Sequence, residues 1–418
     1  MPSASTAPPA VLGWRARWVV FFSLTVWTIS VGSAAEPFLR TELLFPLESW
    51  HNHGSSLVEA PNGDLFAAWF HGSGERKADD VRIEGARLRR AQKQWSARFT
   101  LADTPGYPDC NPALHVDRRG HLWLFYPTIL DNHWEGALLK FRVSSDWQSQ
   151  TPPRWDRSEV LHVTPGTNFE GTIAAVLPEM ERWATAQSWE EKTRREVQEY
   201  LDATRLHATN LLYRRLGWMP RAHPLAIGDR LILGVYHDGF SFSLMAITDD
   251  AGTNWHPSMP LIGGGNIQPS LTRRRDGTLV TYMRDNGPPP KRLLQSESPD
   301  LGESWSPVID SEIPNPGSGA DHIALRDGTW AFIGNDTEEG RARLSVWLSD
   351  DEGRSWRWRR ALEDGSKGEG YSYPSLLESR DGTLHATYSV HLPSGKSIRH
   401  AAFNLEWVKG GTVKPGSN

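Results

Sequence analysis

Cysteine is almost absent from this chain, because Cys110 is the only one among 418 residues. An intrachain disulfide is therefore excluded, and so is a metal site built on several thiolates. Acidic and basic residues are interspersed and nearly balance, at a formal net charge of −5, so nothing indicates a nucleic-acid partner. We expect Cys110 to be a small buried side chain of the core.

Long apolar runs are also missing, except for one at the N-terminus. Arg15 and Arg17 precede an apolar stretch at 18–31, and small residues follow at 32–35. This order is typical of a secretory leader, and the run is short for a membrane span. We expect residues 1–35 to be a signal peptide or, alternatively, an uncleaved N-terminal anchor. Either way we expect the rest to be exported, to the periplasm or outside the cell, with no other integral membrane role.

A short pattern recurs three times in the second half of the chain. Each copy reads Ser/Thr-x-Asp-x-Gly-x-x-Trp, beginning at Thr248, Ser298 and Ser349, and the aspartates are 50 and 51 residues apart. A fixed period of this size indicates one supersecondary unit used repeatedly. We expect the Asp to accept from backbone N–H groups two residues on, the Gly to take positive φ and the Trp to pack below. Each copy is then a turn between two strands.

A second repeat is a tight turn followed by an apolar strand. Its glycines are Gly63, Gly120, Gly228, Gly277, Gly328 and Gly382, with steps of 57, 108, 49, 51 and 54 residues. Asn-Gly or Asp-Gly between apolar runs is a strong hairpin signal. The six turns predict six blades of antiparallel sheet, and 20 Trp and 37 Gly suit such a turn-dense β protein.

The longest step contains an insertion at 179–216 with a helical pattern of apolar residues. It either caps one blade edge as a solvated decoration or forms a lid over the channel mouth. The Gly/Lys/Pro-rich residues 409–418 are expected to be a flexible tail.

The two repeats together resemble the Asp-box pattern of sialidases and related β-propellers, over nearly all of the chain after the leader except the insertion. The resemblance implies an all-β, six-bladed propeller of sialidase type over residues 36–408, with the helical insertion between the second and third turn glycines. It also implies an exported glycosidase that cleaves sialic acid or another carboxylated sugar from a glycan, without a cofactor or metal.

The family's nucleophile is a Tyr at the start of the last blade. Tyr373, in Tyr-Pro-Ser-Leu shortly before Gly382, matches that position, and Tyr371 is a rival two residues upstream. Residues i and i+2 share a strand face, so both could point into the channel.

The family binds the substrate carboxylate through arginines. Arg284 lies seven residues after Gly277, and Arg341 lies eight before Ser349, with Arg343 as a near alternative. Two guanidinium groups could hold a carboxylate in a bidentate manner.

The family's general acid lies in a loop after the second strand of the first blade. Asp79 and Asp80 occupy that loop here, three and four residues after Arg76, a further candidate for substrate binding. Neighbouring carboxyls can raise one another's pKa, as an acid catalyst near neutral pH requires.

Two positions depart from the family pattern. His53 replaces the first arginine, and Gln268 replaces the Glu that assists the Tyr. Phenol is a weak nucleophile at neutral pH and Gln cannot accept a proton. Glu369, His322 or Glu170 could take over as base, and the changes open the site to sugars other than sialic acid.

A radial array of sheets places strand ends around a central channel, which adds Asn111 and Asp321 as candidates for substrate binding. Glu75, Tyr236 and Asp238 are further polar residues offered by the same strand ends.

Three alternatives stay open. A polysaccharide lyase could use His53 and a Tyr to abstract the C5 proton of a uronic acid, or another glycosidase could use the same two residues on this propeller. The propeller could instead bind glycans without catalysis. His51 and His53, with Asp109 and His237, form a weak candidate set of metal ligands.

Overall fold

The computed structural model describes residues 35–166 and 168–411. The predicted leader, except Ala35, and residues 412–418 of the predicted tail lie outside the described residues. Lys409, where that tail was expected to begin, still belongs to helix α4 (Leu405–Lys409). Among the helices of the described part, none has the length and apolarity that a membrane crossing requires.

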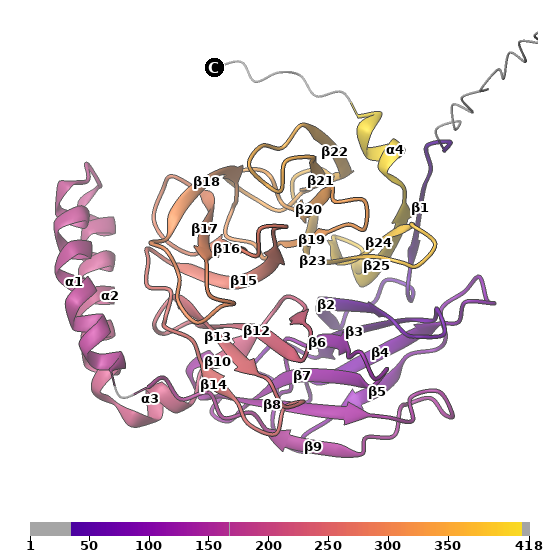
Figure 1. Ribbon diagram of the computed structural model, residues 1–418, viewed down its shortest axis with the longest axis horizontal. Helices are drawn as coiled ribbons and strands as arrows, with labels where there is room; N and C mark the ends of the chain where they lie inside the picture. The colour runs from indigo at the N-terminus through magenta and orange to yellow at the C-terminus, as the bar shows by residue number, and fades with distance from the viewer. Residues whose placement is uncertain (1–34, 167, 412–418) are drawn as a thin grey trace, which may run out of the picture. The chain divides into compact units, whose positions relative to one another are not determined.

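Six antiparallel sheets arranged in a ring confirm the predicted six-bladed β-propeller (Figure 1). Blade 1 contains β2 (His51–Glu59), β3 (Leu65–Gly72), β4 (Arg82–Leu88) and β5 (Phe99–Ala102). Blade 2 contains β6 (Ala113–Val116), β7 (Leu122–Ile129), β8 (Ala137–Ser144) and β9 (Arg157–Val160), and the short helix η1 (Trp134–Gly136) joins β7 to β8. Blade 3 contains β10 (Trp218–Pro220), β11 (Leu225–Ile227), β12 (Arg230–His237), β13 (Phe242–Thr248) and β14 (His256–Pro257).

The other three blades have four strands each. Blade 4 contains β15 (Asn266–Arg273), β16 (Leu279–Asp285), β17 (Arg292–Ser298) and β18 (Ile309–Pro314). Blade 5 contains β19 (Asp321–Ala324), β20 (Trp330–Gly334), β21 (Arg343–Ser349) and β22 (Trp358–Asp364). Blade 6 contains β23 (Gly370–Glu378), β24 (Leu384–Leu392), β25 (Gly395–Phe403) and β1 (Leu39–Leu43). Because β1 pairs with β25, a strand from one end of the chain closes the blade built from the other.

Both predicted repeats form the expected turns, at different places in the blades. The six glycine turns join β2 to β3, β6 to β7, β11 to β12, β15 to β16, β19 to β20 and β23 to β24, and the three Asp-boxes join the last two strands of blades 3, 4 and 5. In one Asp-box, Asp300 Oδ1 accepts from the backbone N–H of Ser304 at 2.9 Å, four residues on rather than the expected two. Leu301 and Gly302 both have positive φ, 60° and 94°, because a two-residue turn of this hand needs left-handed backbone at both positions.

The insertion is helical, as predicted, but begins ten residues earlier than expected. It contains α1 (Phe169–Ala186), α2 (Glu191–Thr209) and α3 (Leu211–Arg215). Pro178 lies inside α1, whereas a proline usually marks the first turn of a helix. Figure 1 shows α1 and α2 side by side at the rim of the propeller, and Tyr200 Oη donates to the carbonyl of Phe240 at 2.8 Å. The insertion therefore covers the edge of blade 3.

The innermost strands of four blades bend at the same place, where they reach one end of the channel. Gly54, Asn111, Gln268 and Tyr373 all have positive φ, between 43° and 63°. The strand pairing shifts register beside three of these bends. Three of the four residues precede a proline in the sequence, which disfavours the right-handed helical region for them.

Serines just after these bends tie neighbouring blades together. Ser56 Oγ accepts from the N–H of Leu114 at 2.9 Å, linking blades 1 and 2. Ser375 Oγ accepts from Leu57 at 3.1 Å, which links blades 6 and 1. Their buried hydroxyls replace backbone partners that the inner edge strands would otherwise lack.

Two buried charged residues add links across the channel. We call these links, together with those of the serines, the buried belt. Arg221 donates to the carbonyls of Ser55 at 2.9 Å and Pro374 at 3.1 Å, so it joins blade 3 to blades 1 and 6. Asp321 of blade 5 accepts from Ser270 Oγ and from the N–H of Leu376, both at 2.8 Å. It also pairs with the ring of His223, 3.2 Å away.

The ion pair makes stability depend on pH in a defined direction. Burial opposes both charges, but the charge of Asp321 raises the pKa of His223, and that of His223 helps to lower the pKa of Asp321. The His223 contribution is complete below about pH 6.5 and is lost as the pH rises through the raised folded-state value. The Asp321 contribution is present above about pH 3.9 and is lost as the pH falls through the lowered value.

We therefore expect His223→Gln to destabilise the chain more at pH 5 than at pH 9. At pH 5 the loss should be about 1 to 3 kcal/mol, the value of a hydrogen bond between charged groups. Urea denaturation of the wild-type chain and of His223→Gln at both pH values measures this loss of stability. His256→Gln is the control, because His256 pairs with Glu303 at an exposed site. An equal loss at pH 5 and pH 9 would contradict the assigned ion pair.

Candidate active site

A cavity of about 580 Å³ lies at the end of the channel where the strands bend. Seven of the residues predicted from the sequence line it: His53, Arg76, Asn111, Gln268, Arg284, Arg341 and Tyr373. They come from blades 1, 2, 4, 5 and 6. The register of the turn glycines and Asp-boxes thus selects residues that the fold brings together.

Tyr373 is the most densely contacted side chain of this cavity. Arg284 Nη1 donates to its hydroxyl at 2.9 Å. The guanidinium groups of Arg221 and Arg341 lie 5.1 and 5.2 Å from the centre of its ring. Its left-handed backbone, with φ of 53°, is costly for an aromatic residue and is typical of functional sites.

These cations change the acidity of the phenol. Burial alone would raise the pKa of Tyr373, but the charges of Arg284 and Arg341 outweigh it, and the pKa falls below its usual value. Gln268 and Arg221 act in the same direction. A phenol with a lowered pKa has a larger fraction of the nucleophilic phenolate at neutral pH.

His53 is a neutral side chain at this site. Its ring centre lies 4.3 Å from that of Tyr373 and 5.0 Å from that of His391. Burial lowers the pKa of His53 far below its ordinary value, and the neighbouring His391 adds to the shift. It therefore does not supply the positive charge of the arginine that it replaces.

Gln268 and Asn111 are held by a tyrosine that the sequence analysis offered only as one of many strand-end residues. Gln268 Nε2 and Asn111 Nδ2 donate to Tyr236 Oη at 3.2 and 3.1 Å. The Gln268 carbonyl oxygen is buried without a hydrogen-bond partner among the described residues.

Another part of the cavity wall comes from the loops that carry Glu75 and Trp134. Arg76 lies over the Trp134 ring at 5.0 Å and pairs with Glu75 at 3.7 Å. A contact with His51 lowers the pKa of Glu75, so this carboxyl stays ionised at neutral pH and cannot serve as an acid there.

Asp238 has the properties that an acid catalyst needs. It lines the cavity directly after β12, and burial raises its pKa to about 6. A carboxyl with this pKa is still partly protonated near neutral pH. The sequence indicates Asp238 only as a strand-end residue, because its burial, which raises the pKa, follows from the fold.

Asp79 and Asp80, predicted as the acid, do not line the cavity, and both are exposed. Asp79 accepts from Asn132 Nδ2 at 2.9 Å, and Asp80 accepts from the N–H and hydroxyl of Ser73 at 3.0 and 2.9 Å. The loop folds back on itself, so that Glu75 and Arg76 reach the cavity in their place.

Tyr371 and Asp321 also lie outside the cavity lining. Tyr371 donates to Glu369 at 3.0 Å and packs in the apolar core of blades 5 and 6. The bend at Tyr373 removes the alternation that would have put both tyrosines on one face. Asp321 belongs to the buried belt below the cavity.

The candidate replacement bases and Arg343 also lie outside the cavity lining, and the candidate metal ligands do not form a site. Glu369, His322 and Glu170 do not line the cavity, and Arg343 faces Asp336 at 3.4 Å instead of the channel. In the described ranges, no group of three or more His, Cys, Asp or Glu side chains could hold a metal ion. His51, His53, Asp109 and His237 therefore do not form the metal site considered above.

Arg221, which lies against the Tyr373 ring, is not among the residues predicted from the sequence. It lies between Pro220 and Ala222 in a stretch without an Asp-Gly turn of its own. The available signal was indirect, since an arginine flanked by apolar residues and prolines in the first strand region of a blade points inward.

Comparison with known proteins agrees with this architecture. The family described as "BNR repeat-like domain" matches residues 63–209 and 176–386. A sialidase from Micromonospora viridifaciens is 28% identical over 388 residues, which cover 85% of this chain and 52% of that protein. The chain thus spans about half the length of this relative.

Solved structures share the fold at low identity. The Hadza microbial sialidase Hz136 has a TM-score of 0.62 at 16% identity, covering 85% of this chain and 66% of that chain. The leech intramolecular trans-sialidase has a TM-score of 0.63 at 14% identity, covering 89% and 71%. With the family match extending over most of the propeller, the chain belongs to the BNR repeat-like family of sialidase-type β-propellers.

Proposed function

We propose that the protein is a glycosidase that cleaves a terminal carboxylated sugar, sialic acid or a related acid, from a glycan. One observation carries the proposal: the Tyr373 hydroxyl faces an open cavity while it accepts from Arg284 and is flanked by two more guanidinium groups. The relative from Micromonospora viridifaciens, named as a sialidase, supports this reaction class.

Three acids, Glu75, Glu135 and Asp238, line the cavity beside its arginines, and it is the position of the arginines that favours an anionic sugar. Arg76, Arg284 and Arg341 line the cavity, and Arg284 and Arg341 both lie against Tyr373. A carboxylate on the anomeric carbon would bind these two guanidinium groups and thereby hold that carbon near the phenol oxygen. A Tyr nucleophile suits such a substrate, because a carboxylate nucleophile would be repelled.

The reaction then proceeds in two balanced steps. The Tyr373 phenolate forms a bond to the anomeric carbon while the bond to the leaving oxygen breaks, and Asp238 gives that oxygen its proton. Water next attacks the anomeric carbon and gives its proton to the Asp238 carboxylate, and the bond to Tyr373 breaks. The phenolate and the protonated acid are restored.

Arg221 explains how the phenol ionises without the Glu of the family pattern. A substrate carboxylate neutralises much of the charge of Arg284 and Arg341 when it binds. Arg221 lies below the ring, is 2% exposed and is not part of the cavity lining, so its charge persists. We infer that it is the positioning residue that keeps the phenolate accessible in the complex.

Replacement of the nucleophile gives the first test of this proposal. Tyr373→Phe should lower kcat/KM for an aryl sialoside by about 10³-fold or more, because it removes the attacking oxygen. The free energy of unfolding should change by about 1 kcal/mol at most, since one partly exposed hydrogen bond is lost. Tyr371→Phe, at a buried tyrosine outside the cavity, is the matched control and should keep nearly full activity.

Two outcomes would reject the assignment. Full activity of Tyr373→Phe would exclude Tyr373 as nucleophile. Release of a product absorbing at 235 nm from a uronate polymer, without hydrolysis of any sialoside, would favour the lyase instead. The contact of neutral His53 with Tyr373 is the feature that supports that second candidate.

The acid gives the second test. Because a general acid must be protonated and the pKa of Asp238 is about 6, kcat/KM should fall as the pH rises above about 6. Asp238→Asn should abolish this decline and slow hydrolysis of a methyl sialoside by about 10²- to 10⁴-fold. A 4-nitrophenyl sialoside, whose leaving group needs no proton, should be much less affected.

The sequence-predicted acids serve as controls for this experiment. Asp79→Asn and Asp80→Asn should leave the pH profile unchanged, since neither residue lines the cavity. A profile altered by either of them, but not by Asp238→Asn, would overturn the assignment of the acid.

A further inference from the structure

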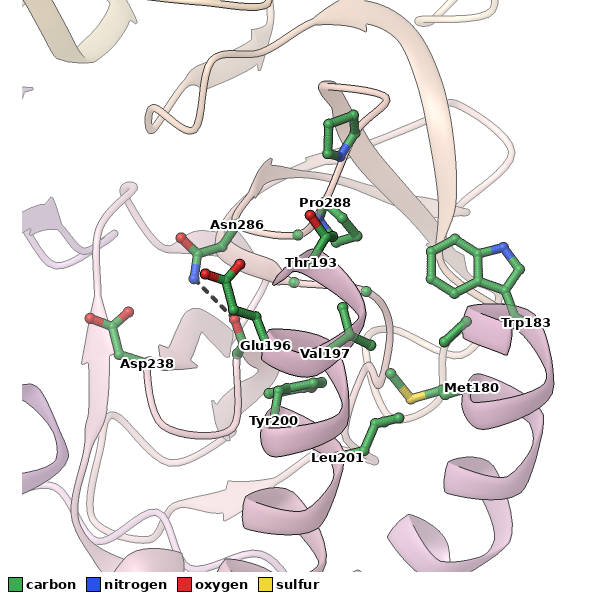
Figure 2. A pocket seen from close by; sticks show the side chains of 16 residues that line it. Met180, Trp183, Thr193, Glu196, Val197, Tyr200, Leu201, Asp238, Asn286 and Pro288 are labelled. Atoms are coloured by element: carbon green, nitrogen blue, oxygen red, sulfur yellow. Dashed lines mark hydrogen bonds between the residues drawn. The ribbon is translucent and has the colours of Figure 1, made fainter. Parts of the chain in front are cut away.

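A second cavity of about 520 Å³ lies between the helical insertion and the propeller. Helix α1 contributes Met180 and Trp183, and helix α2 contributes Val197 and Tyr200. Figure 2 shows the side chains of both helices facing the loop that carries Asn286 and Pro288. We call this space the side cavity.

The side cavity adjoins the candidate active site. Asp238 and Asn286 line both spaces, and Asn286 Nδ2 donates to Ser241 Oγ at 3.1 Å, a bond drawn in Figure 2. The proposed acid thus lies at the junction of the two cavities. In a substrate that spans them, the scissile oxygen would lie at this junction, beside the group that must protonate it.

The two cavities differ in their charged lining. The first combines three arginines with Glu75, Glu135 and Asp238, whereas the charged residues described around the side cavity are two acids, Glu196 and Asp238. A carboxylated ring therefore finds cationic partners in the first space and is repelled by the acids of the side cavity. Apolar groups on one wall of the side cavity suit a hydrophobic surface.

We propose that the side cavity binds the leaving group of the substrate, and that this group is uncharged and has an apolar face. The inference rests on the proposed glycosidase reaction, which supplies the bond that is broken at the junction. Trp183 is the main contact residue, because its ring is 48% exposed while it lines the cavity, and exposed aromatic rings bind the apolar faces of aryl groups and sugars.

The test compares leaving groups that differ in size but not in reactivity. Methyl and benzyl sialosides are matched, because their alcohols have similar acidity, and a galactosyl sialoside tests a neutral sugar in the same place. The ratio of kcat/KM for benzyl to methyl should exceed one in the wild-type chain. Trp183→Ala should lower this ratio by about 3- to 10-fold, the range of one aromatic contact.

Leu206→Ala is the matched control. Leu206 is an exposed apolar residue of α2 that does not line the side cavity, so its replacement should leave the ratio unchanged. A ratio is independent of the fraction of folded enzyme, and a thermal melt of each variant checks folding separately. If the galactosyl substrate loses as much as the benzyl one in Trp183→Ala, the natural leaving group is a neutral sugar.

Failure of this inference differs from failure of the proposed function. Hydrolysis of the methyl sialoside with a ratio that Trp183→Ala does not change would reject the side cavity but keep the glycosidase. Absence of all hydrolysis would reject the glycosidase. Saturation transfer from the protein to benzyl alcohol, lost in Trp183→Ala, would then still support an apolar binding site, and no transfer would reject it.

Discussion

The left-handed bend at the start of the innermost strands is the constraint on which the site depends. A non-glycine residue in this conformation costs on the order of 1 kcal/mol or more, yet Asn111, Gln268 and Tyr373 all adopt it. The belt of hydrogen bonds directly below, including Arg221 to the carbonyls of Ser55 and Pro374, offsets this cost. The bend turns each side chain out of the strand alternation, so that residues from separate blades face one cavity.

The same belt sets the electrostatics of the cavity. Arg221 lies under the tyrosine ring, and Arg284 and Arg341 lie at its exposed side. All three guanidinium groups favour the phenolate, whereas His53 is neutral and adds no positive charge to the site. Asp238 lies beyond them with its pKa raised by burial. Cations beside the proposed nucleophile and a partly protonated carboxyl across the cavity match the separation of roles that retaining glycosidases need.

The sequence predicts the fold better than the site, and for a physical reason. Repeats report hydrogen-bonded turns, whose residues are fixed locally, so the six blades follow from the sequence, and the family resemblance then places Arg284 and Tyr373 by counting from those turns. Asp79 and Asp80 lie outside the cavity lining because a loop's path depends on distant contacts, here with Asn132. The pKa of Asp238 depends on burial, and burial is a property of the assembled propeller rather than of any segment.

Gln268, at the position where the family pattern has Glu, has a physical consequence for the proposed nucleophile. A carboxylate beside Tyr373 would accept its proton, but it would also raise the phenol's pKa through repulsion of the phenolate. Gln268 removes both effects, and the remaining cations act alone. Ionisation then depends on a permanent charge that substrate cannot reach, which only a buried cation such as Arg221 provides. Its hydrogen bonds to the bends of blades 1 and 6 tie that charge to the geometry of the nucleophile, so that one residue couples the closure of the ring to the reactivity of the site.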